Sequence, residues 1–350
     1  MSQRNHEVTK VQPLLKPDGS LTEPGWSRKL YQVYDRSKIK APAFRIKEWD
    51  YYLIMGDDFG LACTISDDGY IGLQSVSLLD FSDPANPWEH TNTVLDVFPL
   101  GKMHMPSSTD RGNVSYHKKD LDLDYFKYDG GRHIACTFRN FRDGKTLTAD
   151  IRLNEPDMDS LVIATPWAEK KTAFYYNRKI NCMRAEGKVT FDGKDYVFDP
   201  ERNYGTLDWG RGVWTYDNTW YWSSGNGTVD GRAFGFNLGY GFGDTAAASE
   251  NIVFVDGVGH KLDDISFNIP VGADGKKDYM SPWTFTSSDG RFEAEFVPVL
   301  DRAACLDFKV IVSDQHQVFG RMSGTAILDD GQKIEFKDLL CFAEDVHNKY

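Results

Sequence analysis

The chain has 350 residues, which is enough for two domains that each bury their own core. Its 14% aromatic and 41% hydrophobic residues exclude a disordered chain. The formal net charge of −12 disfavours nucleic acid and anionic membrane surfaces as partners, because an acidic surface repels phosphate groups.

Cysteine and histidine spacing argues against disulfides and metal sites. The five cysteines include no C-x-x-C pair, and each lies in strand-like sequence where a thiol packs as a small hydrophobe. The histidines show no zinc-ligand spacing, and no glycine-rich segment matches a phosphate-binding loop. We therefore expect no metal and no cofactor. The polar N-terminus, and apolar runs all shorter than about 18 residues, predict a cytoplasmic protein without stable membrane insertion.

Residues 1–44 are expected to form an N-terminal leader. Turn signals in it include Leu14-Leu-Lys-Pro-Asp-Gly-Ser and Glu23-Pro-Gly-Trp26. Beyond it, Asp-Gly recurs between segments that alternate with period two, as in Lys188-Val-Thr-Phe-Asp-Gly-Lys-Asp-Tyr-Val-Phe198. Asp-Gly is a strong signal for a two-residue hairpin turn, since both residues tolerate positive φ. The pattern predicts an all-β fold made of antiparallel strands.

Three blocks of sequence recur in the same order along the chain. The segment at Trp49 resembles that at Trp220, Asp143-Gly with its following strand resembles Asp289-Gly, and the segment from Gly187 resembles that from Gly324. Their shared order favours an internal duplication. We therefore predict a first β domain over residues 45–204 and a second over 205–350. The last segment, 336–346, suits a short helix or a closing strand.

The segment from Leu207 to Trp222 holds the densest group of aromatic and charged residues. If Asp217 and Asn218 form a tight turn, its two halves pair as a hairpin. Asp208 and Arg211 then project to opposite faces unless Gly210 or Gly212 forms a bulge. The aromatic residues suit a ligand pocket or a packed core, and Asp208 with Arg211 suits an active site or a structural ion pair.

Two further segments carry candidate proton-transfer groups. Three alternating glycines in Asn237–Gly243 predict a strand against which a backbone or a ligand packs closely, with Asp244 and Glu250 near its end. These carboxylates suit acid/base catalysis or ordinary turns. In Ser313-Asp-Gln-His-Gln-Val-Phe-Gly-Arg321, Asp314 can orient the imidazole of His316 or simply form a turn.

These segments together resemble a bacterial family of unknown function, and the match extends back to Leu14. That family is similar, more remotely, to the hydroxyneurosporene synthase (carotenoid 1,2-hydratase) and AttH-like group. The remote likeness rests on Gly187-x-Val-x-Phe-x-Gly-x-x-Tyr, on Asp208 beside Trp209-Gly210, and on the Trp220/Trp222 pair. It implies two tandem lipocalin-like β barrels or sandwiches with a ligand cleft between or within them. In the hydratase group a histidine follows the aspartate, whereas Trp209 stands here.

We expect the protein to bind a small apolar molecule, lipid or terpenoid-like, in an aromatic cleft. One hypothesis is a cofactor-independent hydratase, isomerase or cyclase; a non-catalytic lipid carrier and a carbohydrate-active enzyme with a carboxylate pair are the alternatives. The candidate catalytic residues are Asp208, Arg211, Glu250 and His316. The candidate ligand-binding residues are Trp214, Tyr216, Trp220, Trp222, Tyr240, Asp244 and Arg321.

Overall fold

The computed structural model describes residues 4–307 and 312–349. Within those two ranges the chain forms strands and two 3-10 helices, η1 (Arg36–Lys38) and η2 (Ala43–Arg45), and no α-helix. The prediction of an all-β fold is confirmed. The described residues also include no helix that is long and apolar enough to span a membrane.

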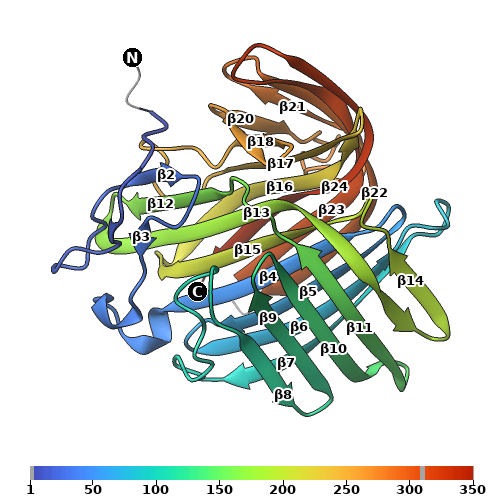
Figure 1. Cartoon of the computed structure of the whole chain (residues 1–350), viewed down its shortest axis with the longest axis horizontal. Coiled ribbons are helices and arrows are strands. Elements are labelled where there is room, and N and C mark those ends of the chain that lie inside the picture. The colour runs from blue at the N-terminus through green and yellow to red at the C-terminus, as the bar shows by residue number, and fades with distance from the viewer. Residues whose placement is uncertain (1–3, 308–311, 350) are drawn as a thin grey trace.

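The first sheet has thirteen strands (Figure 1). Its main path runs β7-β6-β5-β4-β15-β13-β11-β10-β9-β8, with β12 and β14 paired to β13 and β2 paired to β12. The strands are β2 (Gly25–Ser27), β4 (Lys47–Met55), β5 (Phe59–Asp67), β6 (Ile71–Asp80), β7 (Trp88–Val97), β8 (Val114–Lys118), β9 (Leu121–Tyr128), β10 (Gly131–Arg142), β11 (Lys145–Asn154), β12 (Leu161–Trp167), β13 (Lys170–Phe191), β14 (Lys194–Phe198) and β15 (Tyr204–Val213).

The second sheet has nine strands in the order β19-β18-β17-β16-β24-β23-β22-β21-β20. These are β16 (Asp217–Val229), β17 (Arg232–Tyr240), β18 (Ile252–Val255), β19 (Val258–Lys261), β20 (Ile265–Asn268), β21 (Trp283–Ser287), β22 (Phe292–Asp307), β23 (Val312–Ile327) and β24 (Lys333–Lys349). The last strand pairs with β16, the first, much as β15 pairs with β4 in the first sheet. Both sheets therefore follow one topology, a duplicated curled antiparallel unit of lipocalin-like type.

Several of the Asp-Gly pairs are the hairpin turns that the sequence predicts. At Asp143, Asp192, Asp230 and Asp256 the aspartate and the following glycine both have positive φ, and strands begin and end on either side. This is the geometry of a two-residue turn that matches the twist of its strands. The segment 336–346 lies within β24 and is a strand, which settles the alternatives left open for it.

Each sheet has one face on its own core and one face towards the other sheet. In β4, Tyr52 and Ile54 pack into the core of the first sheet. Tyr51 and Leu53 point the opposite way and join Phe342 of the second sheet in a cluster between the sheets. Because side chains alternate along a strand, one residue's parity decides whether it stabilises a core or faces the space between the sheets.

The hairpin predicted across residues 207–222 does not form. β15 pairs with β13 and β4, whereas β16 pairs with β17 and β24, so the chain passes from one sheet to the other after Val213. This change-over comes later than the expected division at 204/205. We propose that the two domains divide here, since β15 completes the first sheet.

The leader contacts both units. Its strand β2 pairs with β12 of the first sheet, while Arg28 contacts Asp159 and the carbonyl of Gly259 in β19. Within the leader, β1 (Gln12–Pro13) and β3 (Gln32–Val33) form a separate two-stranded sheet.

Candidate functional site

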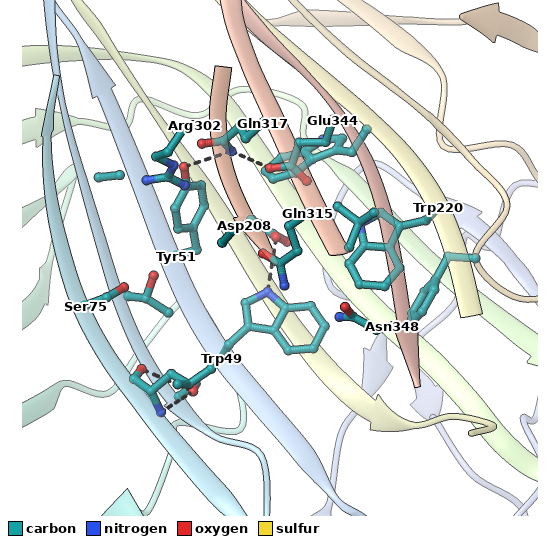
Figure 2. Close-up of a pocket in the computed structure, with 18 of the residues that line it drawn as sticks. Trp49, Tyr51, Ser75, Asp208, Trp220, Arg302, Gln315, Gln317, Glu344 and Asn348 are labelled. Carbon is teal, nitrogen blue, oxygen red and sulfur yellow. Dashed lines mark hydrogen bonds between the residues drawn. The ribbon is translucent and has the colours of Figure 1, made fainter. Parts of the chain in front are cut away.

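A cavity of about 440 Å³ lies between the two sheets, on the faces that point away from the separate cores. Strands β4 to β7, β13 and β15 of the first sheet form one side. Strands β16, β17 and β22 to β24 of the second form the other. Figure 2 shows side chains from both sheets converging on Asp208.

Asp208 is buried at the centre of the cavity with three donors around its carboxylate. Its Oδ1 lies 2.8 Å from Nζ of Lys179 and accepts a hydrogen bond from Nδ2 of Asn177 at 2.6 Å. Its Oδ2 accepts one from Nε1 of Trp49 at 3.1 Å (Figure 2). Lys179 is opposite Asp208 in the β13–β15 pairing, and its ammonium also lies 3.9 Å from the ring centre of Trp222. A buried carboxylate held by several donors keeps one orientation.

A glycine makes room for the indole that holds Asp208. Gly210 lies opposite Trp49 in the β4–β15 pairing. A Cβ at Gly210 would lie 2.0 Å from Cζ2 of Trp49, so only glycine lets the indole cross the strand here. The glycine that the sequence marks as a bulge therefore serves close packing.

Glu250 is the second carboxyl group of the cavity. Its side chain is 6% exposed, and among the described residues its carboxylate has no hydrogen-bond or ion-pair partner. Gly239 packs against it, because a Cβ there would lie 3.5 Å from Oε2 of Glu250. Burial raises the pKa of Glu250 to about 6, with the positive charge of Lys179 opposing the shift and the negative charge of Asp208 adding to it.

A third carboxyl group, Glu344, lies on the second sheet. Burial raises its pKa to about 7 against the opposing charge of Arg302. Gln317 donates a hydrogen bond to Glu344, and the Tyr51 hydroxyl lies 3.5 Å from the same Gln317 nitrogen (Figure 2). Burial raises the pKa of Tyr51 to about 12, so this phenol stays protonated at neutral pH.

Aromatic rings form one end of the cavity. Phe242 lies at their centre, with ring-centroid distances of 5.3 Å to Trp214, 5.1 Å to Trp220 and 4.9 Å to Tyr175. Trp49 adds its ring 5.6 Å from Trp214. In edge-to-face pairs of this kind the positive edge of one ring meets the negative face of another, which packs the rings closely at this end of the cavity.

Arg211 is not the partner of Asp208, and the prediction that a glycine bulge brings them together is wrong. The pairing of β15 is regular from Leu207 to Val213, so Arg211 points into the first core. There it is fully buried, 2.8 Å from Oδ1 of Asp50, and donates to the carbonyls of Trp49 and Pro106. The cation paired with Asp208 is Lys179 and not Arg211.

Of the other candidate residues, Trp214, Trp220, Trp222 and Tyr240 line the cavity, and their part in ligand binding remains a prediction. His316 does not line it, since Gln315 and Gln317 point inward and His316 points the other way. Its Nδ1 lies 2.7 Å from Asp301, and its ring stacks on Tyr279 at 3.8 Å.

Three more candidates lie outside the cavity lining. Tyr216 is 47% exposed. Asp244 is exposed in a turn, where its carboxylate accepts a hydrogen bond from the backbone of Ala246. Arg321 donates to the carbonyl of Asp338. Each belongs to a motif in which a neighbouring residue lines the cavity. The motif alone does not tell which of its side chains point into the cavity and which point away.

Sequence reasoning missed Lys179, Arg302 and Glu344. Each stands in a long strand with no distinctive motif around it. The one available signal was that lysine and glutamate are rarely buried without a partner. This signal becomes useful only when the pairing of β13 with β15 is known, because that pairing brings Lys179 to Asp208.

Comparison with solved structures shows the lipocalin-like fold. Kievitone hydratase from Nectria haematococca matches with a TM-score of 0.50 and 12% identity over 97% of this chain and 98% of its own. A putative AttH protein from Nitrosomonas europaea matches with a TM-score of 0.52 and 13% identity over 96% and 99%. No curated protein matches the sequence. The model of one family, described as domain of unknown function (DUF2804), matches residues 5–350, and the chain belongs to that family.

Proposed function

We propose that the cavity between the sheets binds an apolar, unsaturated small molecule and adds water to it, or removes water from it, by acid/base catalysis. Glu250 is the proton donor and Asp208 the proton acceptor in the direction of hydration. Such a reaction transfers only protons and water, which carboxyl groups suffice to handle.

The observation that carries this proposal is Glu250, a buried carboxyl group facing the cavity and lacking a protein partner among the described residues. Its carboxylate lines the cavity, so a ligand or water there is the partner open to it, and carboxyl groups with raised pKa values in cavities concentrate at functional sites. With its pKa raised to about 6, Glu250 can both hold and release a proton near neutral pH. Water that leaves when an apolar ligand enters would raise this pKa further.

The proposed hydration balances in atoms and charge. The carboxyl proton of Glu250 forms a new C–H bond with the π electrons of the substrate double bond, which leaves a carbocation on the neighbouring carbon. A water oxygen bonds to that carbon, and its proton passes to the carboxylate of Asp208. Proton exchange with solvent then returns Glu250 to its neutral form and Asp208 to its charged form, and dehydration runs through the same steps in reverse.

The aromatic rings support this chemistry because they stabilise positive charge. The ring faces of tryptophan attract cations by about 1–2 kcal/mol when water is excluded. Trp49, Trp214 and Trp220 all line the cavity that holds both carboxyl groups. A carbocation formed there would lie among ring faces and opposite the Asp208 carboxylate.

The test starts from protein purified from its native host. Native mass spectrometry would identify a co-purifying molecule, which we expect to be apolar and unsaturated or a hydrated product. The extracted molecule would then be incubated with fresh protein in heavy-oxygen water and in deuterated water. A hydratase incorporates the heavy oxygen, whereas an isomerase incorporates only deuterium.

The alternatives give different results in the same experiment. A lipid carrier returns the molecule unlabelled from both solvents. A carbohydrate-active enzyme co-purifies with a sugar and labels its anomeric carbon with heavy oxygen. Either result overturns the proposal.

A further inference from the structure

Opposite the aromatic end, the cavity is lined by hydroxyl groups, beside the carboxyl groups of Asp68 and Glu89. Thr64 of β5 lies opposite Ser75 of β6, and Ser77 of β6 lies opposite Thr91 of β7. All four line the cavity. In Figure 2, Ser75 and Arg302 lie on one side of Asp208 and Trp220 lies on the other. The cavity is therefore polar at one end and aromatic at the other.

Arg302 of β22 reaches this polar end from the second sheet. Its Nη1 donates to Oγ of Ser77 at 2.8 Å, and Ser77 in turn lies 2.8 Å from Oγ1 of Thr91. Within residues 4–307 and 312–349 it has no carboxylate within ion-pairing distance. By contrast, Lys179, the other cation of the cavity, is paired with Asp208.

The three arginines that are buried among the described residues are each paired with a carboxylate. Arg132 contacts Glu155 at 2.9 Å, Arg178 contacts Asp110, and Arg211 contacts Asp50 at 2.8 Å. Arg302, which is half-buried, instead faces the cavity and has no carboxylate partner among the described residues. A guanidinium so placed is suited to bind an oxyanion through two parallel hydrogen bonds.

Among charged groups, Arg302 acts most strongly on the pKa of Glu344, which it lowers against the larger effect of burial. The resulting pKa of about 7 leaves a substantial share of the Glu344 carboxyl group protonated at neutral pH. Gln317, which donates to Glu344, has its Oε1 buried without a hydrogen bond in the described structure. This end of the cavity thus offers one cation, whereas the unused Gln317 oxygen is an acceptor and does not bind an anion.

We infer that the ligand is amphipathic, with an oxyanion at one end that Arg302 binds and an unsaturated apolar part that extends past Asp208 to the aromatic end. The oxyanion is a carboxylate or a phosphate monoester. This inference rests on the proposed function for the apolar part. We call this contact between the oxyanion and Arg302 the anchor. It fixes the orientation of the ligand in the cavity, and so decides which carbon lies next to Glu250.

Equilibrium dialysis with three matched probes tests the inference: farnesol, farnesoate and farnesyl phosphate. They share one unsaturated chain and differ in the end group. We expect at least one anion to bind about tenfold more tightly than farnesol, which corresponds to one additional charge-assisted hydrogen-bonded contact. The preferred anion identifies the oxyanion.

Arg302→Gln should abolish this preference and leave farnesol binding unchanged, while Arg302→Lys should retain part of it as a point charge. Arg232→Gln serves as the matched control, because Arg232 lies on β17, pairs with Asp256 and does not line the cavity. Equal binding of all three probes by the wild type overturns the anchor alone. Failure of every probe to bind overturns both the anchor and the proposed apolar site.

Discussion

Lys179 and Asp208 face each other across β13 and β15 with 2.8 Å between ammonium and carboxylate, and both side chains are almost fully buried. The same ammonium contacts the Trp222 ring of the second sheet. One ion pair therefore orients the proposed proton acceptor and joins the two sheets at the cavity.

Removing one partner of this pair should destabilise the fold. Asp208→Asn leaves the Lys179 ammonium buried beside a neutral amide, and we expect a loss of about 3 kcal/mol in the free energy of unfolding. Lys179→Met should cost a similar amount. The double variant should be less destabilised than the sum of the single variants by at least about 1 kcal/mol, as measured by urea denaturation. Strict additivity would contradict the pairing.

Arg211 should matter for stability and not for ligand binding. Arg211→Met strands the carboxylate of Asp50 in the first core and should cost about 3–5 kcal/mol. Farnesol affinity of the folded variant should equal that of the wild type. If the single variant does not fold, Asp50→Asn combined with Arg211→Met removes the stranded charge. If Arg211→Met loses farnesol binding and keeps the free energy of unfolding of the wild type, Arg211 is part of the binding site.

The raised pKa of Glu250 should appear in the pH dependence of stability. A carboxyl group with a pKa of about 6 when folded and 4.5 when unfolded stabilises the fold below pH 4.5, and this stabilisation is lost as the pH rises through 6. Glu250→Gln has no such loss. The variant should therefore gain about 2 kcal/mol on the wild type between pH 4.5 and pH 8. A constant difference in urea denaturation across that range would contradict the assignment.

Anion binding at Arg302 should be linked to protonation of Glu344. The groups that act on Glu344 are Arg302, Lys179 and Asp208, with the Tyr51 phenol close by. A bound carboxylate adds negative charge, raises the pKa of Glu344 further and causes proton uptake. Farnesoate should therefore bind more tightly at about pH 6 than at about pH 8.

Two comparisons isolate this linkage. Farnesol, which brings no charge, should show only the smaller pH dependence that desolvation of Glu250 causes, and farnesoate should show more. Glu344→Gln should reduce the pH dependence of farnesoate binding to that of farnesol, because it removes the group that responds to the bound charge. A pH dependence of farnesoate binding that still exceeds that of farnesol in Glu344→Gln would show that another group is responsible.

Local sequence signals predicted the all-β class well. Asp-Gly turns such as Asp143 and Asp192 depend only on backbone conformations that those two residue types tolerate. The repeat was also visible, because duplicated hairpins keep their order along the chain. These features need no knowledge of which strands become neighbours.

The site was less predictable, because it depends on pairing between distant strands. Asp208 and Glu250 attracted attention through their neighbours in the chain. Lys179 reaches Asp208 only through the pairing of β13 with β15, and Glu344 reaches the cavity only through the parity of β24. The predicted hairpin across Asp217 failed for the same reason, since a local turn signal does not reveal that two strands join different sheets.

The most direct test of the central claim is the rate at which Glu250→Gln incorporates heavy oxygen into the co-purifying molecule. The control is Glu295→Gln, which changes an exposed glutamate on β22. We predict wild-type turnover in the control and a loss of about 10²- to 10⁴-fold in Glu250→Gln, with ligand binding retained in both. Wild-type turnover by Glu250→Gln would contradict the proposed mechanism.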